Sequence, residues 1–208
     1  MYSKSNGKVP HTGSDSRHQC LIYEGSPSKQ LPALAAMIRQ KLAEGHRCLY
    51  LNSRPMVAGM RSYLAALGCD VESELAEGRL VLSSEPVTSA NGDFDVEMML
   101  NQLSQAVDRA LKDGYRGLWA TGDMTWEFGN EKNFLKLMQY EYRLDALMVK
   151  RPELSGICQY HQDTLPPEAI RQARLTHPSL FITETLSRIN PDYILRVLSD
   201  EPKARIAA

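Results

Sequence analysis

Glu141 is the most unusual residue when the hydrophobic periodicity of the chain is followed. It lies four residues after Leu137 and three before Leu144, in the middle of the apolar stripe of a predicted long helix. A carboxylate on that stripe faces the core, where burial without a partner is costly. We therefore expect either a salt bridge to a core arginine, such as Arg116 or Arg143, or a contact with a ligand.

Other polar side chains follow the ends of predicted strands, where open parallel sheets bind their ligands. Tyr23 and Glu24 end the first strand, Tyr160 ends a later one, and Asp123 and Trp126 follow a third. Aromatic surface with one carboxylate is typical of a small-molecule cavity. Packing of Trp126 in the core, beside the start of a helix, is an equal alternative.

Cysteine and histidine provide a second set of reactive groups. His18, Cys20, Cys158 and His161 flank two strands and form a conceivable metal-binding set. Such short spacings are common by chance, and buried cysteine usually packs as a small hydrophobe. Core packing is therefore favoured, and neither a metal nor another cofactor is expected. The chain also lacks a nucleophile motif and paired carboxylates, so we expect no catalytic residue.

Composition excludes several classes of function. The chain has 208 residues, 24 Lys and Arg against 25 Asp and Glu, and a formal charge of -1, which disfavours binding to nucleic acid through bulk charge. No apolar run reaches the length of a membrane span, and the first residues are polar, so we expect a cytoplasmic protein with no membrane contact. The turn after the first strand lacks the glycines of a phosphate-binding loop, which disfavours nucleotides.

Predicted strands and helices alternate along the chain. The strands cover residues 19–23, 47–52, 79–83, 117–122, 154–160 and 180–183, and the helices start near Pro27, Pro55, Asp95, Glu131 and Pro167. This alternation predicts an α/β three-layer sandwich with a mainly parallel central sheet. We expect a flexible tail over residues 1–17, one domain over residues 18–183, and a C-terminal helical extension and tail over residues 184–208, with a helix starting at Asn190.

The motifs of the chain resemble those of a known family, the MEDS domain, a methanogen/methylotroph, DcmR-type sensory domain. The resemblance covers about residues 17 to 183 and rests on an ordered series of motifs. These are His18-Gln-Cys20-Leu-Ile-Tyr23-Glu24, Gly45-His-Arg-Cys-Leu-Tyr50, Gly68-Cys-Asp70-Val, Gly78-Arg-Leu-Val81, Gly122-Asp-Met-Thr-Trp126, Tyr140-Glu141, Cys158-Gln-Tyr160 and Thr176-His-Pro178.

The resemblance implies a RecA/KaiC-like fold without a functional phosphate-binding loop and a role in sensing simple hydrocarbon derivatives. It also implies that the first strand lies between the strand over residues 154–160 and the last short strand. Cys20 would then neighbour Cys158, and His18 would approach His177, as structural or second-site residues. One departure is Asp123, where family members usually carry glutamate, which shortens the reach of the carboxylate.

We therefore expect a cytoplasmic sensory domain that binds a small organic ligand and signals to a separate regulatory protein, a kinase or transcription regulator. Tyr23, Glu24, Asp123, Trp126, Glu141, Cys158 and Tyr160 are the candidate ligand-binding residues. His18 and Tyr23 lie at opposite ends of one strand, roughly 16 Å apart at about 3.3 Å per residue, so they cannot line one small pocket.

Three alternatives remain open. The first is a nucleotide-hydrolysing RecA-like enzyme, in which Lys29 and Asp123 would contact phosphate and metal. The second is a ligand-free interaction adaptor, in which the C-terminal helix would dock a partner or form a homodimer. The third is a metal sensor built on the cysteine and histidine residues.

Overall fold

A seven-stranded sheet runs through the centre of the molecule. The structure is a computed structural model that describes residues 17–85, 87, 93–127, 134–183 and 186–194. The strands are β1 (His18–Tyr23), β2 (Arg47–Leu51), β3 (Leu80–Ser83), β4 (Leu118–Asp123), β5 (Leu154–His161), β6 (Ser179–Thr183) and β7 (Leu186–Ile189). The helices are α1 (Leu31–Ala43), α2 (Arg54–Ala66), α3 (Val71–Ala76), α4 (Val96–Lys112), α5 (Met124–Glu127), α6 (Phe134–Lys150) and α7 (Pro167–Thr176).

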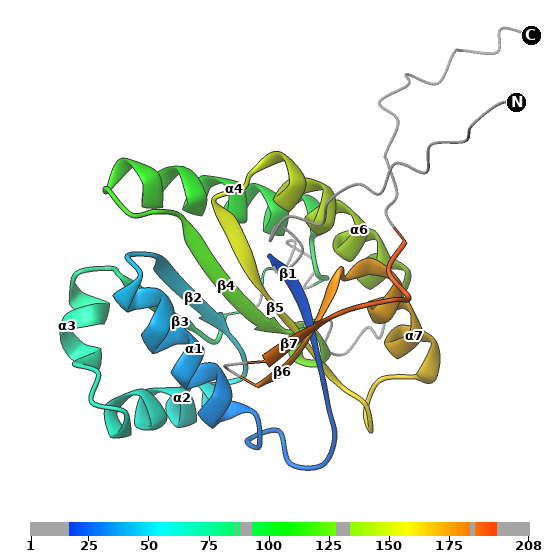
Figure 1. Ribbon diagram of the computed structural model, residues 1–208, viewed down its shortest axis with the longest axis horizontal. Coiled ribbons are helices and arrows are strands. Elements are labelled where there is room, and N and C mark those ends of the chain that lie inside the picture. The colour runs from blue at the N-terminus through cyan, green and yellow to red at the C-terminus, as the bar shows by residue number, and fades with distance from the viewer. Residues whose placement is uncertain (1–16, 86, 88–92, 128–133, 184–185, 195–208) are drawn as a thin grey trace, which may run out of the picture.

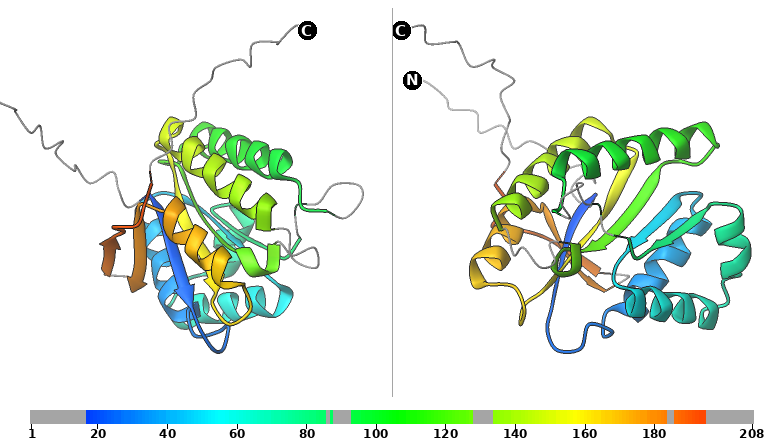
Figure 2. Two further views of the ribbon diagram at one scale, coloured as in Figure 1. Left: turned by 90° about the vertical axis from the view of Figure 1, so that its right-hand side faces the viewer. Right: turned by 180° about the vertical axis from the view of Figure 1, so that it is seen from behind.

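The order of the strands in the sheet is β3-β2-β4-β5-β1-β6-β7. Every neighbouring pair is parallel except β6 and β7, which are antiparallel and form one edge of the sheet (Figure 2). The expected position of β1 between β5 and β6 is confirmed. Cys20 pairs with Cys158 in the register of β1 and β5, which confirms that the two residues are neighbours.

Helices cover both faces of the sheet, which confirms the three-layer α/β sandwich (Figure 1). Alternate strand residues face opposite sides, and each side forms its own apolar core. One core packs β-strand side chains against α1, α2 and α3, and the other packs them against α4, α6 and α7. Along β5, Ile157 faces the first core, whereas Cys158 and Tyr160 face the second.

Local signals explain where several helices begin and end. The Asp95 carboxylate accepts a hydrogen bond from the amide of Met98 at 2.9 Å, so it caps α4 as predicted. The predicted start of α1 at Pro27 is wrong. The helix begins at Leu31, with Pro32 in its first turn, and residues 27–30 before it form a turn in which the Lys29 amide donates to the Ser26 carbonyl at 3.0 Å.

The sequence prediction omitted three short elements: α3, α5 and β7. It also placed a helix from Asn190, but the structure has a turn at residues 191–192 and no regular structure at residues 193–194. The Asn190 side chain instead donates hydrogen bonds to the carbonyls of Arg174 and His177, and so it fastens the segment after β7 to the end of α7. Residues 195–208 of the predicted extension, like residues 1–16 of the predicted tail, lie outside the described residues. Among the helices that the structure describes, none is long and apolar enough to cross a bilayer.

Candidate functional site

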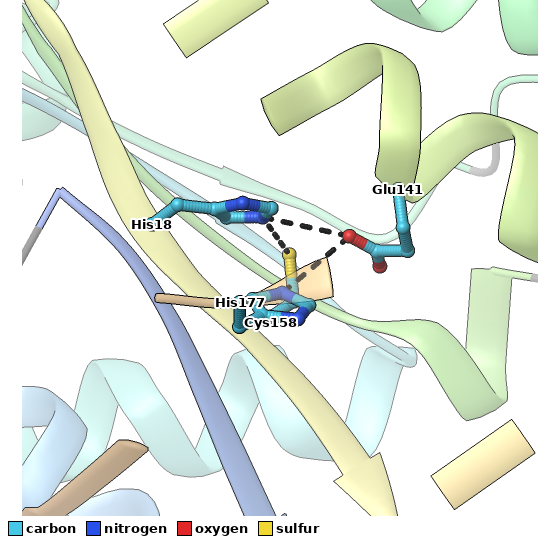
Figure 3. A group of neighbouring side chains, drawn as sticks. All are labelled: His18, Glu141, Cys158 and His177. Carbon is cyan, nitrogen blue, oxygen red and sulfur yellow. Dashed lines mark hydrogen bonds and ion pairs between the residues drawn. The ribbon is translucent and has the colours of Figure 1, made fainter. Parts of the chain in front are cut away.

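Four side chains from distant parts of the chain point toward one another on the α6 and α7 side of the sheet (Figure 3). His18 begins β1, Cys158 lies in β5, Glu141 projects from the middle of α6, and His177 follows the last residue of α7. We call these four residues the buried polar cluster. All four are nearly inaccessible to solvent, with exposed fractions of 2% for His18 and Glu141, 5% for Cys158 and 0% for His177.

The donor atoms of the buried polar cluster lie close together. His18 Nε2 and His177 Nε2 are each 3.5 Å from Glu141 Oε2, and the Cys158 sulfur is 3.7 Å from His18 Nε2. One donor atom from each of the four residues lies within 4.8 Å of all the others. Two imidazole nitrogens, a carboxylate oxygen and a sulfur are donor types that bind transition metals.

Neighbouring groups fix the outer nitrogen of each histidine. His18 Nδ1 lies 3.1 Å from the carboxylate of Asp145, and His177 Nδ1 lies 2.7 Å from the carbonyl oxygen of Ala173. A carbonyl oxygen accepts hydrogen bonds only, so His177 Nδ1 carries the proton and donates. The Nε2 of a neutral His177 therefore presents a lone pair to the centre of the cluster.

Glu141 has one oxygen with a hydrogen-bond partner and one without. The Tyr160 hydroxyl donates to Glu141 Oε1. Glu141 Oε2 and His177 Nε2 have no hydrogen-bond partner among the residues that the structure describes. Two buried acceptors thus face each other 3.5 Å apart. This arrangement is unfavourable unless positive charge lies beside both atoms.

The pKa values of the cluster show how that charge is distributed. Burial alone would raise the pKa of Glu141, but His177, His18 and the Tyr160 hydroxyl lower it below its ordinary value. Burial opposes a charge on His18, yet the neighbouring carboxylates of Asp145 and Glu141 raise its pKa. Burial and the neighbouring His18 lower the pKa of His177 to about 4. At neutral pH the protein alone therefore holds a neutral His177 beside an ionised Glu141.

Two residues that the sequence analysis did not identify complete the surroundings of the cluster. Asp145 lies one helical turn after Glu141, and its second carboxylate oxygen accepts a hydrogen bond from Tyr193 at 2.7 Å. The (i, i+4) spacing on α6 was a usable signal for Asp145, because such residues share a helix face. No sequence signal identified Tyr193, which reaches the site only through the backbone turn after β7.

A small cavity adjoins the cluster between α6 and α7. Its volume is about 10 Å³, which is room for one molecule or group of about the size of water. The side chains of Glu141 and Tyr160 form part of its wall, beside Leu137, Met138, Ala169, Gln172, Ala173 and Thr176. The apolar residues Leu137, Ala169 and Ala173 are themselves buried.

The structure separates the residues that the sequence placed in one pocket. Tyr23 and Asp123 lie on the α1 side of the sheet, where the Tyr23 hydroxyl donates to Asp123 at 2.7 Å. Asp123 also accepts a hydrogen bond from the amide of Thr125 at 2.8 Å, and the Tyr23 ring stacks on His161. Tyr160 and Glu141 lie on the opposite side. Both predicted acidic anchors are buried, but they do not share a cavity.

The remaining candidates have separate positions. Glu24 is exposed in the loop after β1. Trp126 lies in α5, and its side chain is outside the described residues. The expected approach of His18 to His177 is confirmed, since their ring centroids are 4.0 Å apart. Cys20 is buried beside the cluster, and burial together with the charge of Glu141 raises the pKa of its thiol well above the ordinary value.

One expected partner of Glu141 was wrong. Arg143 does not pair with Glu141, because it points to the surface and its guanidinium forms an ion pair with Glu97 of α4. The conceivable metal set of the sequence analysis also changes. His161 contacts the carbonyl of Gly25 and the Thr164 hydroxyl at the other end of β5, and His177 and Glu141 take the places of His161 and Cys20.

Comparisons with known proteins agree with this architecture. The fold is similar to that of an uncharacterized protein from Pyrococcus horikoshii, whose crystal structure contains an unknown peptide. The TM-score is 0.54 at 12% identity, over 79% of this chain and 76% of the other, so the likeness concerns the fold alone. No curated protein matches the chain. The family model of the MEthanogen/methylotroph, DcmR Sensory domain, MEDS, matches residues 17–178, and the chain therefore belongs to the MEDS family of sensory domains.

Proposed function

We propose that this chain is a non-catalytic signal-input domain that binds a small, hydrocarbon-derived organic molecule and passes the signal to a separate regulatory protein. Membership of a sensory family supports the general role. The observation that carries the choice of ligand is the cavity between α6 and α7, which lies against the buried polar cluster through Glu141 and Tyr160.

The cavity has room for a group of about the size of water, so the methyl end of a one-carbon or two-carbon compound would enter it and the rest of the compound would displace side chains of the wall. Water needs two or more polar partners in a buried site, whereas small apolar cavities stay dry and bind apolar molecules. A methyl or halomethyl group would contact Leu137, Ala169 and Ala173, which are buried apolar residues. A short compound of this kind gains contacts there without leaving a polar group unpaired.

Ion pairs connect α6 and the residue after it to α4. Arg143, two residues after Glu141, pairs with Glu97 of α4, and Arg151, which directly follows α6, donates to Asp108 of α4 at 2.7 Å. The opposite side of α4 forms one wall of an open groove of about 820 Å³, and β2 and β3 form the other. A ligand that favours one position of α6 would thereby alter the groove, which we propose as the surface that signals to the partner.

A panel of short alcohols, alkyl halides and alkylamines tests the ligand. Thermal shift and isothermal titration calorimetry should detect binding of at least one compound to the full chain. Ala173→Val fills the cavity with two methyl groups and should abolish that binding. Ala35→Val is the matched control, because Ala35 is equally buried but lies in α1 on the opposite face. It should retain binding.

The proposal fails if no compound of the panel binds, or if Ala173→Val binds as well as the wild type.

Titration with Mg-ATP tests the competing nucleotide-hydrolase function. Lys29 and Asp123 would have to contact phosphate and metal in that enzyme, yet the Asp123 carboxylate is buried and accepts hydrogen bonds from Tyr23 and Thr125. Calorimetric detection of Mg-ATP binding at micromolar concentrations would contradict the sensory proposal.

A further inference from the structure

We propose that His18, Glu141, Cys158 and His177 bind a zinc ion. The inference does not depend on the organic ligand. It starts from the two acceptors, Glu141 Oε2 and His177 Nε2, which lie 3.5 Å apart and have no hydrogen-bond donor in the described part of the chain. A cation between them would compensate the loss of hydration of both atoms.

The spacing of the donor atoms fits a tetrahedral ion. Zinc binds nitrogen and oxygen at about 2.0–2.2 Å and sulfur at about 2.3 Å, which places neighbouring ligand atoms about 3.3–3.6 Å apart. The two imidazole–carboxylate distances are 3.5 Å and the sulfur–imidazole distance is 3.7 Å. The other donor pairs lie within 4.8 Å and would need only small side-chain rotations.

Each of three ligands already has the outer partner that metal sites use to orient their ligands. Asp145 holds His18 Nδ1, the Ala173 carbonyl holds His177 Nδ1, and the Tyr160 hydroxyl holds the outer oxygen of Glu141. Both imidazoles therefore direct Nε2 inward. A core that only had to pack would not require this alignment of three independent hydrogen bonds.

The charge and donor types favour zinc over calcium or magnesium. A carboxylate and a thiolate together carry two negative charges, which a divalent ion neutralises, so that the ion and its four ligands carry no net charge. Calcium and magnesium prefer oxygen ligands, whereas a set of two imidazoles, one thiolate and one carboxylate suits zinc. The four protein ligands complete a tetrahedron, which is the arrangement of closed zinc sites.

The first test is the metal content of the full chain purified without chelator. Elemental analysis by inductively coupled plasma mass spectrometry should find about one zinc per chain, because a closed four-ligand site binds one ion. The chelated protein is then titrated with Co²⁺ alone. Tetrahedral cobalt should produce intense visible absorption, and the Cys158 thiolate should produce a sulfur-to-cobalt charge-transfer band in the near ultraviolet.

Two cysteine variants identify which sulfur binds the metal. Cys158→Ser should lose the charge-transfer band. Cys20→Ser is the matched control, because Cys20 is also buried and pairs with Cys158 in the sheet but is not among the four ligands. It should keep the band and the stoichiometry. Asp145→Asn removes an outer partner rather than a ligand and should weaken cobalt binding by about 10–100-fold.

A wild-type protein that binds no zinc and yields no cobalt spectrum would overturn the proposal, as would a Cys158→Ser variant that keeps the charge-transfer band. Near-ultraviolet circular dichroism checks the fold of each variant. If Cys158→Ser does not fold, the wild-type spectrum and Asp145→Asn still decide the question. Because no organic compound is added, the outcome is separate from that of the ligand panel.

Discussion

The bond between Tyr160 and Glu141 offers a direct measure of the charge in the buried polar cluster. Tyr160→Phe removes only the hydroxyl, and both residues are almost fully buried. A hydrogen bond to an ionised group contributes about 1.5–3 kcal/mol, and one between neutral groups about 0.5–1.5 kcal/mol. We expect Tyr160→Phe to lower the free energy of unfolding of the metal-free protein by about 2–3 kcal/mol at neutral pH, if Glu141 is ionised.

Tyr50→Phe is the control for this experiment. Tyr50 is fully buried on the opposite face, and its hydroxyl accepts a hydrogen bond of 3.1 Å from the neutral Asn52 side chain. Its loss should cost about 1 kcal/mol. For a domain of this size the melting temperature should fall by about 4–12 °C in Tyr160→Phe and by about 2–4 °C in Tyr50→Phe. Urea unfolding followed by circular dichroism measures both free energies.

The pH dependence of the stability of the two variants provides a second criterion for an ionised Glu141. The pKa of Glu141 is below its ordinary value of 4.5, because the neighbouring His177, His18 and Tyr160 outweigh the effect of burial. A lowered carboxylate pKa stabilises the fold above pH 4.5, and this contribution is lost as the pH falls further. The difference between the two variants should therefore shrink in acid. Equal destabilisation of both variants at neutral pH would refute an ionised Glu141.

Four further outcomes are expected. His177→Gln should reduce the loss of stability that the metal-free protein shows between pH 6.5 and pH 4. The lowered pKa of His177, about 4, stabilises the fold above pH 6.5, and this contribution disappears as the pH falls to 4. Urea unfolding across this range measures the free energy of unfolding. Tyr23→Phe should destabilise the protein by about 1–3 kcal/mol without changing zinc or cobalt content, since its partner Asp123 lies on the other face. Asp95→Ala should lower the free energy of unfolding by about 1 kcal/mol through loss of the α4 cap, measured in the same assay. Arg143→Gln should leave ligand binding intact but reduce the ligand-induced change in hydrogen exchange of α4; an undiminished change would exclude this ion pair as the connection.

Periodicity and turn chemistry were sufficient to predict the sheet and its helices. Parallel strands buried on both faces form continuous apolar runs, and Asp95 and Pro167 mark helix starts through local backbone chemistry. β7 was not predictable in this way. All four of its residues are exposed, so it carries neither a buried run nor an alternating pattern. Its position depends on the tertiary contacts that Asn190 makes with the end of α7.

The candidate site was predictable only in part. Helical spacing showed that Glu141 faces inward, because that conclusion requires only its own helix. Its partners could not be derived from spacing, since β1, β5 and the end of α7 supply them from distant parts of the chain. Strand ends also suggested that Tyr23 and Tyr160 share a pocket. They do not, because the pleat and register of β1 and β5 direct the two side chains to opposite faces.

The central place of β1 has a consequence for biosynthesis. β1 leaves the ribosome before both of its neighbours, which begin at Leu154 and Ser179, more than a hundred residues later in translation. Domains complete their long-range pairings only when all the strands have emerged. The nascent chain must therefore keep both edges of β1 unpaired until β5 has been synthesised, and the apolar run Cys20–Ile22 needs protection from aggregation during that time.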